Sequence, residues 1–185
     1  AYRIAPERSA DGQPRVNTEV MYDNMMNKFT WGRMNEPDVI MEENNLRQMK
    51  IMDIRGTFAR LANALVDAKK MDEAKAVLKK CLELTPDWQV PYDYTMVPVV
   101  GALYDAGMTD EVTQVVDKML TDYSQIGDWL LYLKSRGFVE SREFQMCVSV
   151  LAYIAQEAQQ HGDAAVMERV DQIYRKYSAE LQNFR

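Results

Sequence analysis

The stretch from Arg55 to Pro86 contains two amphipathic patterns separated by a short polar break. Both patterns repeat apolar residues at spacings of three and four, which places them on one face of an α-helix. They comprise Phe58, Leu61, Ala62 and Leu65, and then Ala74, Val77, Leu78, Cys81 and Leu82. Pro86 follows the second pattern, and a proline cannot continue the helical hydrogen bonds. The stretch therefore predicts two packed helices joined by a tight turn.

The order of residue types in this pair resembles the tetratricopeptide signature, a helix–turn–helix unit of about 34 residues. Small residues at Ala62, Ala74 and Cys81 would allow the two helices to approach closely. These residues predict a packing module and carry no catalytic chemistry.

A second pair of helices is predicted from a comparison of the sequence with itself. When the chain is shifted by 38 residues, Met96 aligns with Phe58 and Leu103 aligns with Leu65. The same shift aligns Asp110-Glu111 with Asp72-Glu73. Val112, Val115, Val116, Met119 and Leu120 then continue the apolar stripe. One shift that matches two helices and their turn indicates a second repeat over about 96–121.

The N-terminal part of the chain does not show the pattern of these helix pairs. Residues 1–17 carry two prolines and no periodicity, which predicts an extended lead-in. Thr18 is a suitable N-cap for a helix that runs to about Phe29. Gly32 and Pro37 then indicate a loop.

The first helix of the first pair is expected to begin after a cap at Asn44 or Asn45 and to end near Ala68, so that this pair covers about 45–84. Gly56 interrupts its pattern, and we interpret this glycine as a point of close packing. Pro91 fits the first turn of the next helix. Pro98 lies deeper, so that helix either starts after Thr95 or is kinked.

The C-terminal third predicts a divergent helix pair over about 141–183. Residues 121–139 suggest only a short helix, from Asp128 to Leu133, with Trp129 packed on the array. Ser141 can cap a helix that runs to about Gln160. Gly162 suits the position after a helix end, and a last helix follows it.

These patterns predict an all-α chain in which antiparallel helix pairs stack as a short tetratricopeptide-like array, an α-α superhelix. Residues 18–185 would form this single helical-repeat domain. The formal net charge of −6, without a basic cluster, argues against nucleic acid as a partner. No stretch reaches the roughly 20 apolar residues needed to span a bilayer. The chain begins at Ala1 and not at Met, so we expect it to be part of a longer protein.

The sequence contains little that suggests catalysis, and we predict no catalytic residue, no cofactor and no metal site. Its one histidine, His161, lies at an expected turn, and the carboxylate pairs lie near helix starts, where they complement the helix dipole. Cys81 and Cys147 both fall on apolar helical faces, so we expect buried free thiols. A disulfide between them would require adjacent backbones.

Two stretches combine aromatic and polar side chains in a way that is typical of a binding surface for peptide or sugar. The candidate residues are Tyr22, Asp23, Asn24 and Trp31 in the first stretch, and Trp88, Tyr92, Asp93 and Tyr94 in the second. The alternative is that these aromatic residues close the ends of the array and anchor a long loop.

Three phrases of the sequence carry a family resemblance: RVNTEVMYDNMMNKFTWG from Arg15, EENNLR from Glu42 and VPYDYTMVPV from Val90. They resemble the C-terminal region outside the membrane in large bacterial multi-pass membrane proteins of unknown function. The membrane halves of that family look distantly like protein O-mannosyltransferases. The resemblance weakens after about residue 120, and it includes no catalytic motif.

The resemblance implies a non-catalytic accessory or protein-interaction domain of a membrane-anchored glycosyltransferase-like protein. It would belong to an inner-membrane protein and face the periplasm. Its partner would be a protein or peptide segment, the membrane half of the same polypeptide included. Two alternatives remain: a spacer that stabilises or dimerises the parent protein, and an enzyme with an unrecognised site.

Overall fold

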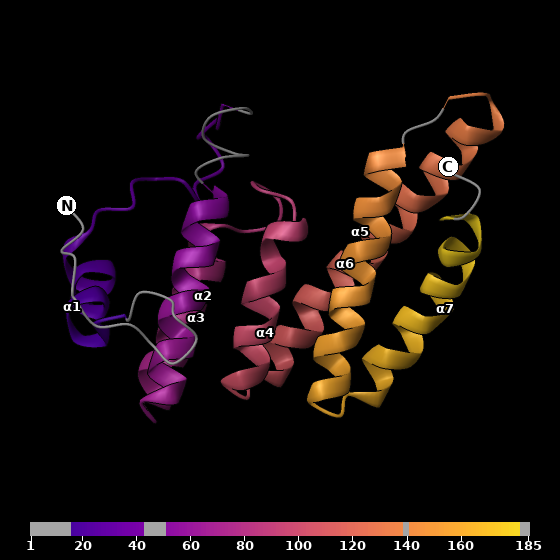
Figure 1. The fold of residues 1–185 in the computed structure, drawn as a ribbon. Coiled ribbons are helices and arrows are strands. Elements are labelled where there is room, and N and C mark those ends of the chain that lie inside the picture. The colour runs from indigo at the N-terminus through magenta and orange to yellow at the C-terminus, as the bar shows by residue number, and fades with distance from the viewer. Residues whose placement is uncertain (1–15, 43–50, 139–140, 182–185) are drawn as a thin grey trace.

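The computed structural model describes residues 16–42, 51–138 and 141–181, and within these ranges the chain consists of helices joined by turns and loops, without a strand. The helices lie in a row that starts with α1 (Thr18–Asp23) at one end and finishes with α7 (Ala164–Leu181) at the other (Figure 1). Between them lie α2 (Ile51–Asp67), α3 (Met71–Leu84), α4 (Val97–Asp105), α5 (Thr109–Ser135) and α6 (Ser141–Gln160). The predicted all-α class is confirmed.

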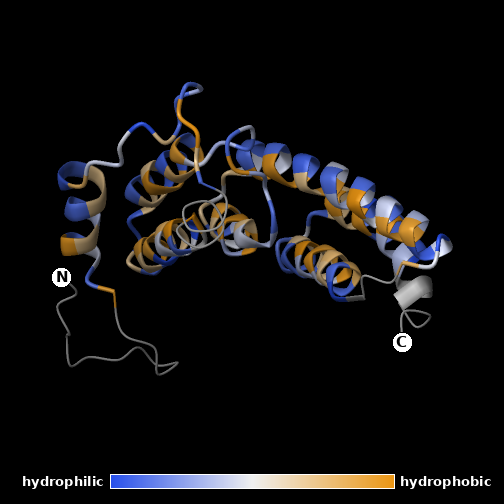
Figure 2. Cartoon of the chain, turned by 90° about the horizontal axis from the view of Figure 1, so that it is seen from above, coloured by the Kyte–Doolittle hydropathy of each residue, from blue (hydrophilic) through white to orange (hydrophobic). Residues whose placement is uncertain are grey.

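Helices α2 to α7 form three antiparallel pairs: α2 with α3, α4 with α5, and α6 with α7. Within one layer α4 packs against both α2 and α6, and on the other side of this layer α5 packs against α7. Seen from above, the hydrophobic sides of the helices face their neighbours and the hydrophilic sides face outward (Figure 2). The apolar stripes therefore meet between the helices and form one core.

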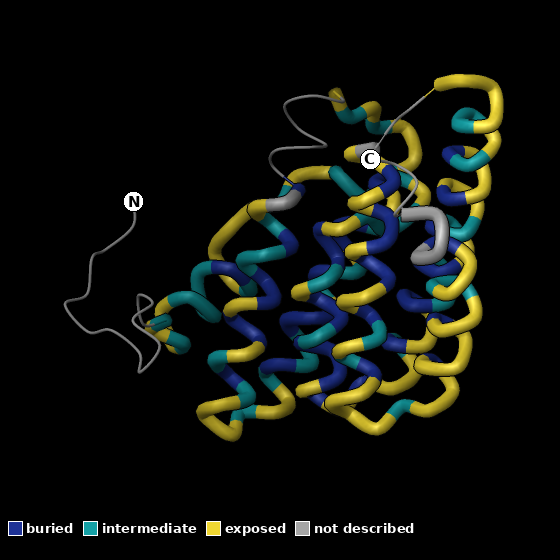
Figure 3. Tube along the Cα trace, turned by 45° about the vertical axis from the view of Figure 1, so that its right-hand side comes forward, coloured by how far each residue is buried: buried dark blue, intermediate teal, exposed yellow. Residues whose placement is uncertain are grey.

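The predicted core residues of the first two pairs are buried. Phe58, Leu65, Cys81, Met96 and Met119 are each fully inaccessible to solvent. The buried residues run along the centre of the array, and the exposed ones cover its outside (Figure 3). Helix α1 contains no buried residue, but Met25, which follows it, is buried in the core, and Met21 and Tyr22 of α1 pack against that core.

The three helix pairs close with the same turn. Lys69, Gly107 and Gly162 have positive φ angles of 62°, 67° and 70°. The next residue donates its backbone N–H five residues back: Lys70 to Leu65 at 2.9 Å, Met108 to Leu103 at 2.9 Å, and Asp163 to Ala158 at 2.8 Å. This is the bond of a Schellman motif, which satisfies a free carbonyl at the helix end. The role predicted for Gly162 is confirmed.

One local prediction is wrong at the N-terminal end. Asn17, and not Thr18, caps α1, because its Oδ1 atom accepts the backbone N–H of Val20 at 3.1 Å. A π-helical segment, η1 (Asn24–Lys28), follows α1 and is closed by a bond from the Phe29 N–H to the Asn24 carbonyl. The predicted caps at Asn44 and Asn45 lie outside the described residues.

The loop after α3 also differs from the prediction. Pro91 does not begin a helix; it lies in the irregular loop before the 3₁₀ turn η3 (Tyr94–Met96). Helix α4 then starts at Val97, with Pro98 in its first turn. Of the two alternatives for Pro98, a start after Thr95 is therefore the observed one. The proline ring is accommodated there because the first helical N–H groups have no partner in the helix.

The largest error concerns residues 121–139. The predicted short helix from Asp128 to Leu133 belongs to α5, which continues without interruption to Ser135, beyond the expected end near residue 121. Leu130 is buried, but Trp129 is 57% exposed and does not pack on the array. The interpretation of Gly56 as a close approach is also wrong, since a Cβ atom there would meet nothing within 4 Å.

Candidate functional site

The side chain of Arg55 is completely buried, although arginine is almost never fully buried without partners. It lies on α2, three residues before Phe58, and points at the loop between α3 and η3. Its Nη2 atom donates to the Val90 carbonyl at 2.8 Å, and its Nη1 atom to the Pro91 carbonyl at 3.1 Å. Nη1 also reaches Thr95 Oγ1 at 2.8 Å. One side chain therefore ties the loop to the first helix pair.

The start of the same loop is held by Arg55 as well. Its Nε atom lies 3.3 Å from Thr85 Oγ1, and its Nη2 atom lies 3.3 Å from the Thr85 carbonyl oxygen. Thr85 in turn donates its hydroxyl proton to the Cys81 carbonyl at 2.9 Å. These bonds satisfy carbonyl groups at the end of α3, which has no glycine cap.

Asp93 is the carboxylate nearest to the buried guanidinium, with Oδ1 at 3.5 Å from Arg55 Nη1. The same oxygen accepts the backbone N–H of Thr95 at 2.9 Å and the Thr95 hydroxyl at 2.5 Å. Asp93 is thus both the N-cap of η3 and the counter-charge of Arg55. Its partly exposed side chain is occupied by these contacts.

Burial governs the ionisation of the groups around Arg55. Desolvation lowers the pKa of Arg55, while the Asp93 charge opposes this shift. Burial raises the pKa of the Cys81 thiol to about 12. Burial likewise raises the pKa of Tyr92, whose ring centroid lies 5.4 Å from the guanidinium carbon. The thiol is therefore protonated at neutral pH and is not a nucleophile.

The first aromatic stretch lies on the other side of the same part of α2. Trp31 packs on Phe58 with 5.1 Å between the ring centroids, and its Nε1 atom donates to the Met25 carbonyl at 2.9 Å. Tyr22 is half-buried against the core. These contacts hold α1 and η1 on the end of the array.

Asp23 and Asn24 do not join the Arg55 cluster. Asp23 forms an ion pair with Lys28 and accepts from Asn27 Nδ2 at 3.0 Å. The hydrogen bond from Lys28 lowers the pKa of Asp23. Asn24 begins the π-helical segment η1. The structure therefore separates these two polar residues from Asp93.

Trp88 and Tyr94 belong to the second stretch but turn away from Arg55, with 57% and 43% of their surfaces exposed. Of the eight predicted residues, only Tyr92 and Asp93 contact the buried guanidinium. A link between the two stretches comes from Gln89, whose Nε2 atom donates to the Val39 carbonyl at 2.7 Å. The loop before α2 and the loop after α3 are thus neighbours.

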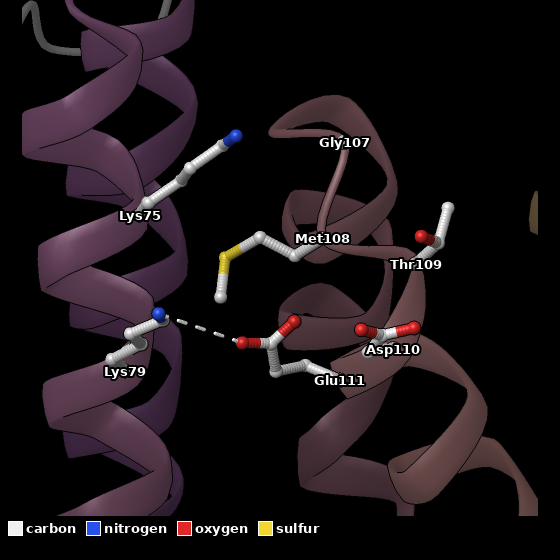
Figure 4. Close-up of a pocket in the computed structure, with 7 residues that line it drawn as sticks. All are labelled: Lys75, Lys79, Gly107, Met108, Thr109, Asp110 and Glu111. Carbon is white, nitrogen blue, oxygen red and sulfur yellow. Dashed lines mark ion pairs between the residues drawn. The ribbon is translucent and has the colours of Figure 1, made fainter.

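An open depression of about 160 Å³ lies between the outer helices α3 and α5 (Figure 4). Lys75 and Lys79 line one side, and Asp110 and Glu111 line the other. Lys79 Nζ lies 3.9 Å from Glu111 Oε1. None of the eight predicted residues lines this depression.

His161 lies at the junction of α4 with the α6–α7 turn. Its ring stacks on Tyr104 at a centroid distance of 4.9 Å, and its Nε2 atom lies 3.4 Å from Asp105 Oδ1. The Tyr104 hydroxyl donates to Asp163 Oδ2 at 3.1 Å. The single histidine is therefore part of a packed interhelical contact.

Both cysteines are free and buried, as predicted. In the described ranges, no three histidine, cysteine, aspartate or glutamate side chains converge in a way that could hold a metal ion. Nor does any helix within these ranges have the length and apolar character needed to cross a membrane.

Comparison of the chain with family models, curated proteins and solved structures found no match.

Arg55 was not among the residues predicted from the sequence to form a site, although it marks the start of the most strongly patterned stretch. Arg55 precedes Phe58 by three residues and Ala62 by seven, so it occupies the apolar face of α2. A charged residue on such a face is a detectable signal. It suggests a buried polar cluster, but it does not identify the loop that supplies the partners.

Proposed function

We propose that this chain is a non-catalytic protein-interaction domain built from three tetratricopeptide-like helix pairs. The observation that carries the proposal is the shared turn of the three pairs. Thirty-eight residues separate Lys69 from Gly107, and 55 separate Gly107 from Gly162. The helix after each turn begins two residues later, at Met71, Thr109 and Ala164. The equivalent positions of the three turns support a single repeated helix–turn–helix unit. The longer spacing between the second and third turns corresponds to an insertion.

The layered packing favours binding over catalysis. Helices α2, α4 and α6 are the first members of the three pairs and lie side by side in one layer. Stacked pairs of this kind form extended surfaces that bind segments of other proteins. The buried polar groups are used inside the fold, since Arg55 and Asp93 bind the loop and His161 packs on Tyr104.

The resemblance of the sequence to the C-terminal regions of bacterial membrane proteins extends this proposal. The chain would be an accessory domain beside a glycosyltransferase-like membrane half and would face the periplasm. Its partner would be a peptide segment, either of an acceptor protein or of that membrane half. This extension rests on sequence phrases and on fold analogy.

Two experiments test the two levels separately. Selection from a random-peptide display library against the folded chain should yield peptides that bind at a single site; recovery of none would reject the interaction domain. The coding sequence upstream of Ala1 should contain several membrane-spanning segments. A start codon at that place would reject the membrane-protein assignment and leave the interaction domain standing.

A further inference from the structure

Two apolar side chains project from neighbouring loops at the edge of the first helix pair. Ile40 is 95% exposed and Trp88 is 57% exposed. Their sequence neighbours Val39 and Gln89 are joined by the 2.7 Å hydrogen bond from Gln89 Nε2 to the Val39 carbonyl. We call Ile40 and Trp88, with the charged groups beside them, the loop surface. Exposed apolar residues on two loops that contact each other can provide a contact surface.

The loop that carries Trp88 is held firmly. Arg55 binds the carbonyl groups of Val90 and Pro91 on one side of Trp88 and that of Thr85 on the other. Inside the loop, the Val90 N–H donates to the Pro86 carbonyl at 2.9 Å. A side chain presented on a fixed loop loses little conformational entropy when it is bound. The loop is therefore organised before any partner arrives.

The charges beside Ile40 have an excess of carboxylate. Arg33 Nη2 contacts both Glu36 Oε2 and Asp38 Oδ2 at 2.6 Å. One guanidinium thus pairs with two carboxylates, so the net charge of these three groups is −1. Asp38 is only two residues from Ile40.

The charges beside Trp88 repeat this arrangement. Lys118 of α5 contacts Asp87 Oδ2 at 3.2 Å and also pairs with Asp122. Two carboxylates again share one cation, and Asp87 is the residue directly before Trp88. Each apolar side chain of the loop surface is therefore within two residues of a carboxylate that shares its cation with a second carboxylate, as counted among the residues that the structure describes.

We propose that the loop surface binds a peptide segment that carries an aromatic or aliphatic anchor flanked by lysine or arginine. The inference deepens the proposed interaction function and rests on it. The anchor would remove Ile40 and Trp88 from water, and the flanking cations would pair with the two negative groups. Buried aromatic residues commonly supply most of the binding energy at interfaces, while rim charges set specificity and the rate of association.

The test uses the full chain and the peptides selected from a random display library. The selected peptides should be rich in aromatic residues and in lysine or arginine. Trp88→Ala and Ile40→Ser should each weaken binding by about tenfold or more, as expected for interface anchors. Trp129→Ala is the matched control, because Trp129 is also 57% exposed but lies on α5 away from these loops. It should leave the dissociation constant within about twofold.

The charges are tested separately by Asp38→Asn and Asp87→Asn. Each should weaken binding a few-fold and reduce its dependence on salt, because surface charge attraction is screened by ions. Asp171→Asn, which removes a carboxylate paired with Arg175 on α7, is the control and should change neither property.

Three outcomes would overturn the inference. Peptides that bind but are insensitive to both Trp88→Ala and Ile40→Ser would reject the loop surface and leave the proposed function intact. Selected peptides with acidic flanks would contradict the charge assignment. Recovery of no peptide would reject both the inference and the proposed function. Circular dichroism of each variant verifies that the fold is retained.

Discussion

The ring of Tyr177 lies directly over the backbone of Gly127, so that a Cβ atom on residue 127 would be 2.5 Å from the ring atom Cζ of Tyr177. The Tyr177 hydroxyl lies 2.6 Å from both the Ser124 carbonyl oxygen and Asp128 Oδ1. Tyr177 belongs to α7 and is fully buried. This contact fixes the C-terminal half of α5 against the last helix.

Gly127→Ala should destabilise the protein by about 1–3 kcal/mol, the usual cost of adding a methyl group to a packed site. Either the ring of Tyr177 must move or the two helices must separate. Chemical denaturation at constant pH measures the effect. The matched control is Gly56→Ala in α2, where a Cβ atom would meet nothing within 4 Å. It should raise the stability by about 0.5–1 kcal/mol because alanine is the better helix former. If both variants changed stability alike, the close approach at Gly127 would be disproved.

Lys69 occupies the position of the shared turn that is a glycine in the other two pairs, Gly107 and Gly162. Its φ angle is 62°, in the left-handed region. A left-handed conformation costs a residue with a Cβ atom about 1–2 kcal/mol. Lys69→Gly removes this cost and should therefore stabilise the protein. The gain should be at most about 1 kcal/mol, because glycine also has more conformational freedom in the unfolded chain, which offsets part of it. Thermal and urea unfolding both report this gain.

A substitution in the opposite direction at an equivalent turn is the control for Lys69→Gly. Gly107→Ala meets no atom within 4 Å, so its whole effect comes from a backbone φ of 67°. It should destabilise the protein by about 1 kcal/mol. A loss of stability in Lys69→Gly would show that the lysine side chain contributes more than its backbone strain costs.

Replacing Arg55 should be the most damaging single change in the first helix pair. Arg55→Met keeps the apolar stem but leaves the Val90 and Pro91 carbonyl groups without their donor. We expect a loss of about 3 kcal/mol or more, because hydrogen bonds to charged groups contribute about 1.5–3 kcal/mol each and unpaired buried groups are costly. Hydrogen exchange should also accelerate in residues 89–96.

Arg175→Met provides the comparison on the surface. Arg175 pairs with Asp171 on α7, and its side chain is 79% exposed. Its replacement should change the stability by less than about 0.5 kcal/mol. Equal effects of the two arginine substitutions would contradict the anchoring role of Arg55.

The buried thiols should make the protein less stable in alkali. Burial raises the pKa of Cys81 to about 12, whereas an exposed thiol titrates near 8.5. Above about pH 8.5 the unfolded chain loses this proton and the folded chain keeps it, so stability falls as the pH rises. The slope approaches about 1.4 kcal/mol per pH unit for one thiol.

Urea unfolding between about pH 8.5 and 9.5 measures this slope below the range in which tyrosine titrates. Cys81→Ala should reduce it, and the Cys81→Ala/Cys147→Ala variant should reduce it further, because burial also raises the pKa of Cys147 to about 12. An unchanged slope in both variants would assign the alkaline effect to other groups.

The sequence was sufficient for the helix pairs because their signal is local. Phe58, Leu65, Leu78 and Cys81 repeat at helical spacing, and each is buried as that spacing requires. The same local reasoning failed for residues 121–139, where only a short helix from Asp128 to Leu133 was predicted although α5 continues to Ser135. Within this segment, the close neighbour that requires a glycine at position 127 is Tyr177, which lies fifty residues later in the chain.

For the candidate site, the sequence identified aromatic and polar loop residues but not their arrangement. It could not show that Tyr92 and Asp93 gather around Arg55 while Trp88 turns outward, because Arg55 and its partners are 30 to 40 residues apart. Helical periodicity is set by neighbouring residues and can be read along the chain. The burial of a charge, a close approach to a glycine and the exposure of an aromatic side chain depend on which distant segments meet, and only tertiary packing decides that.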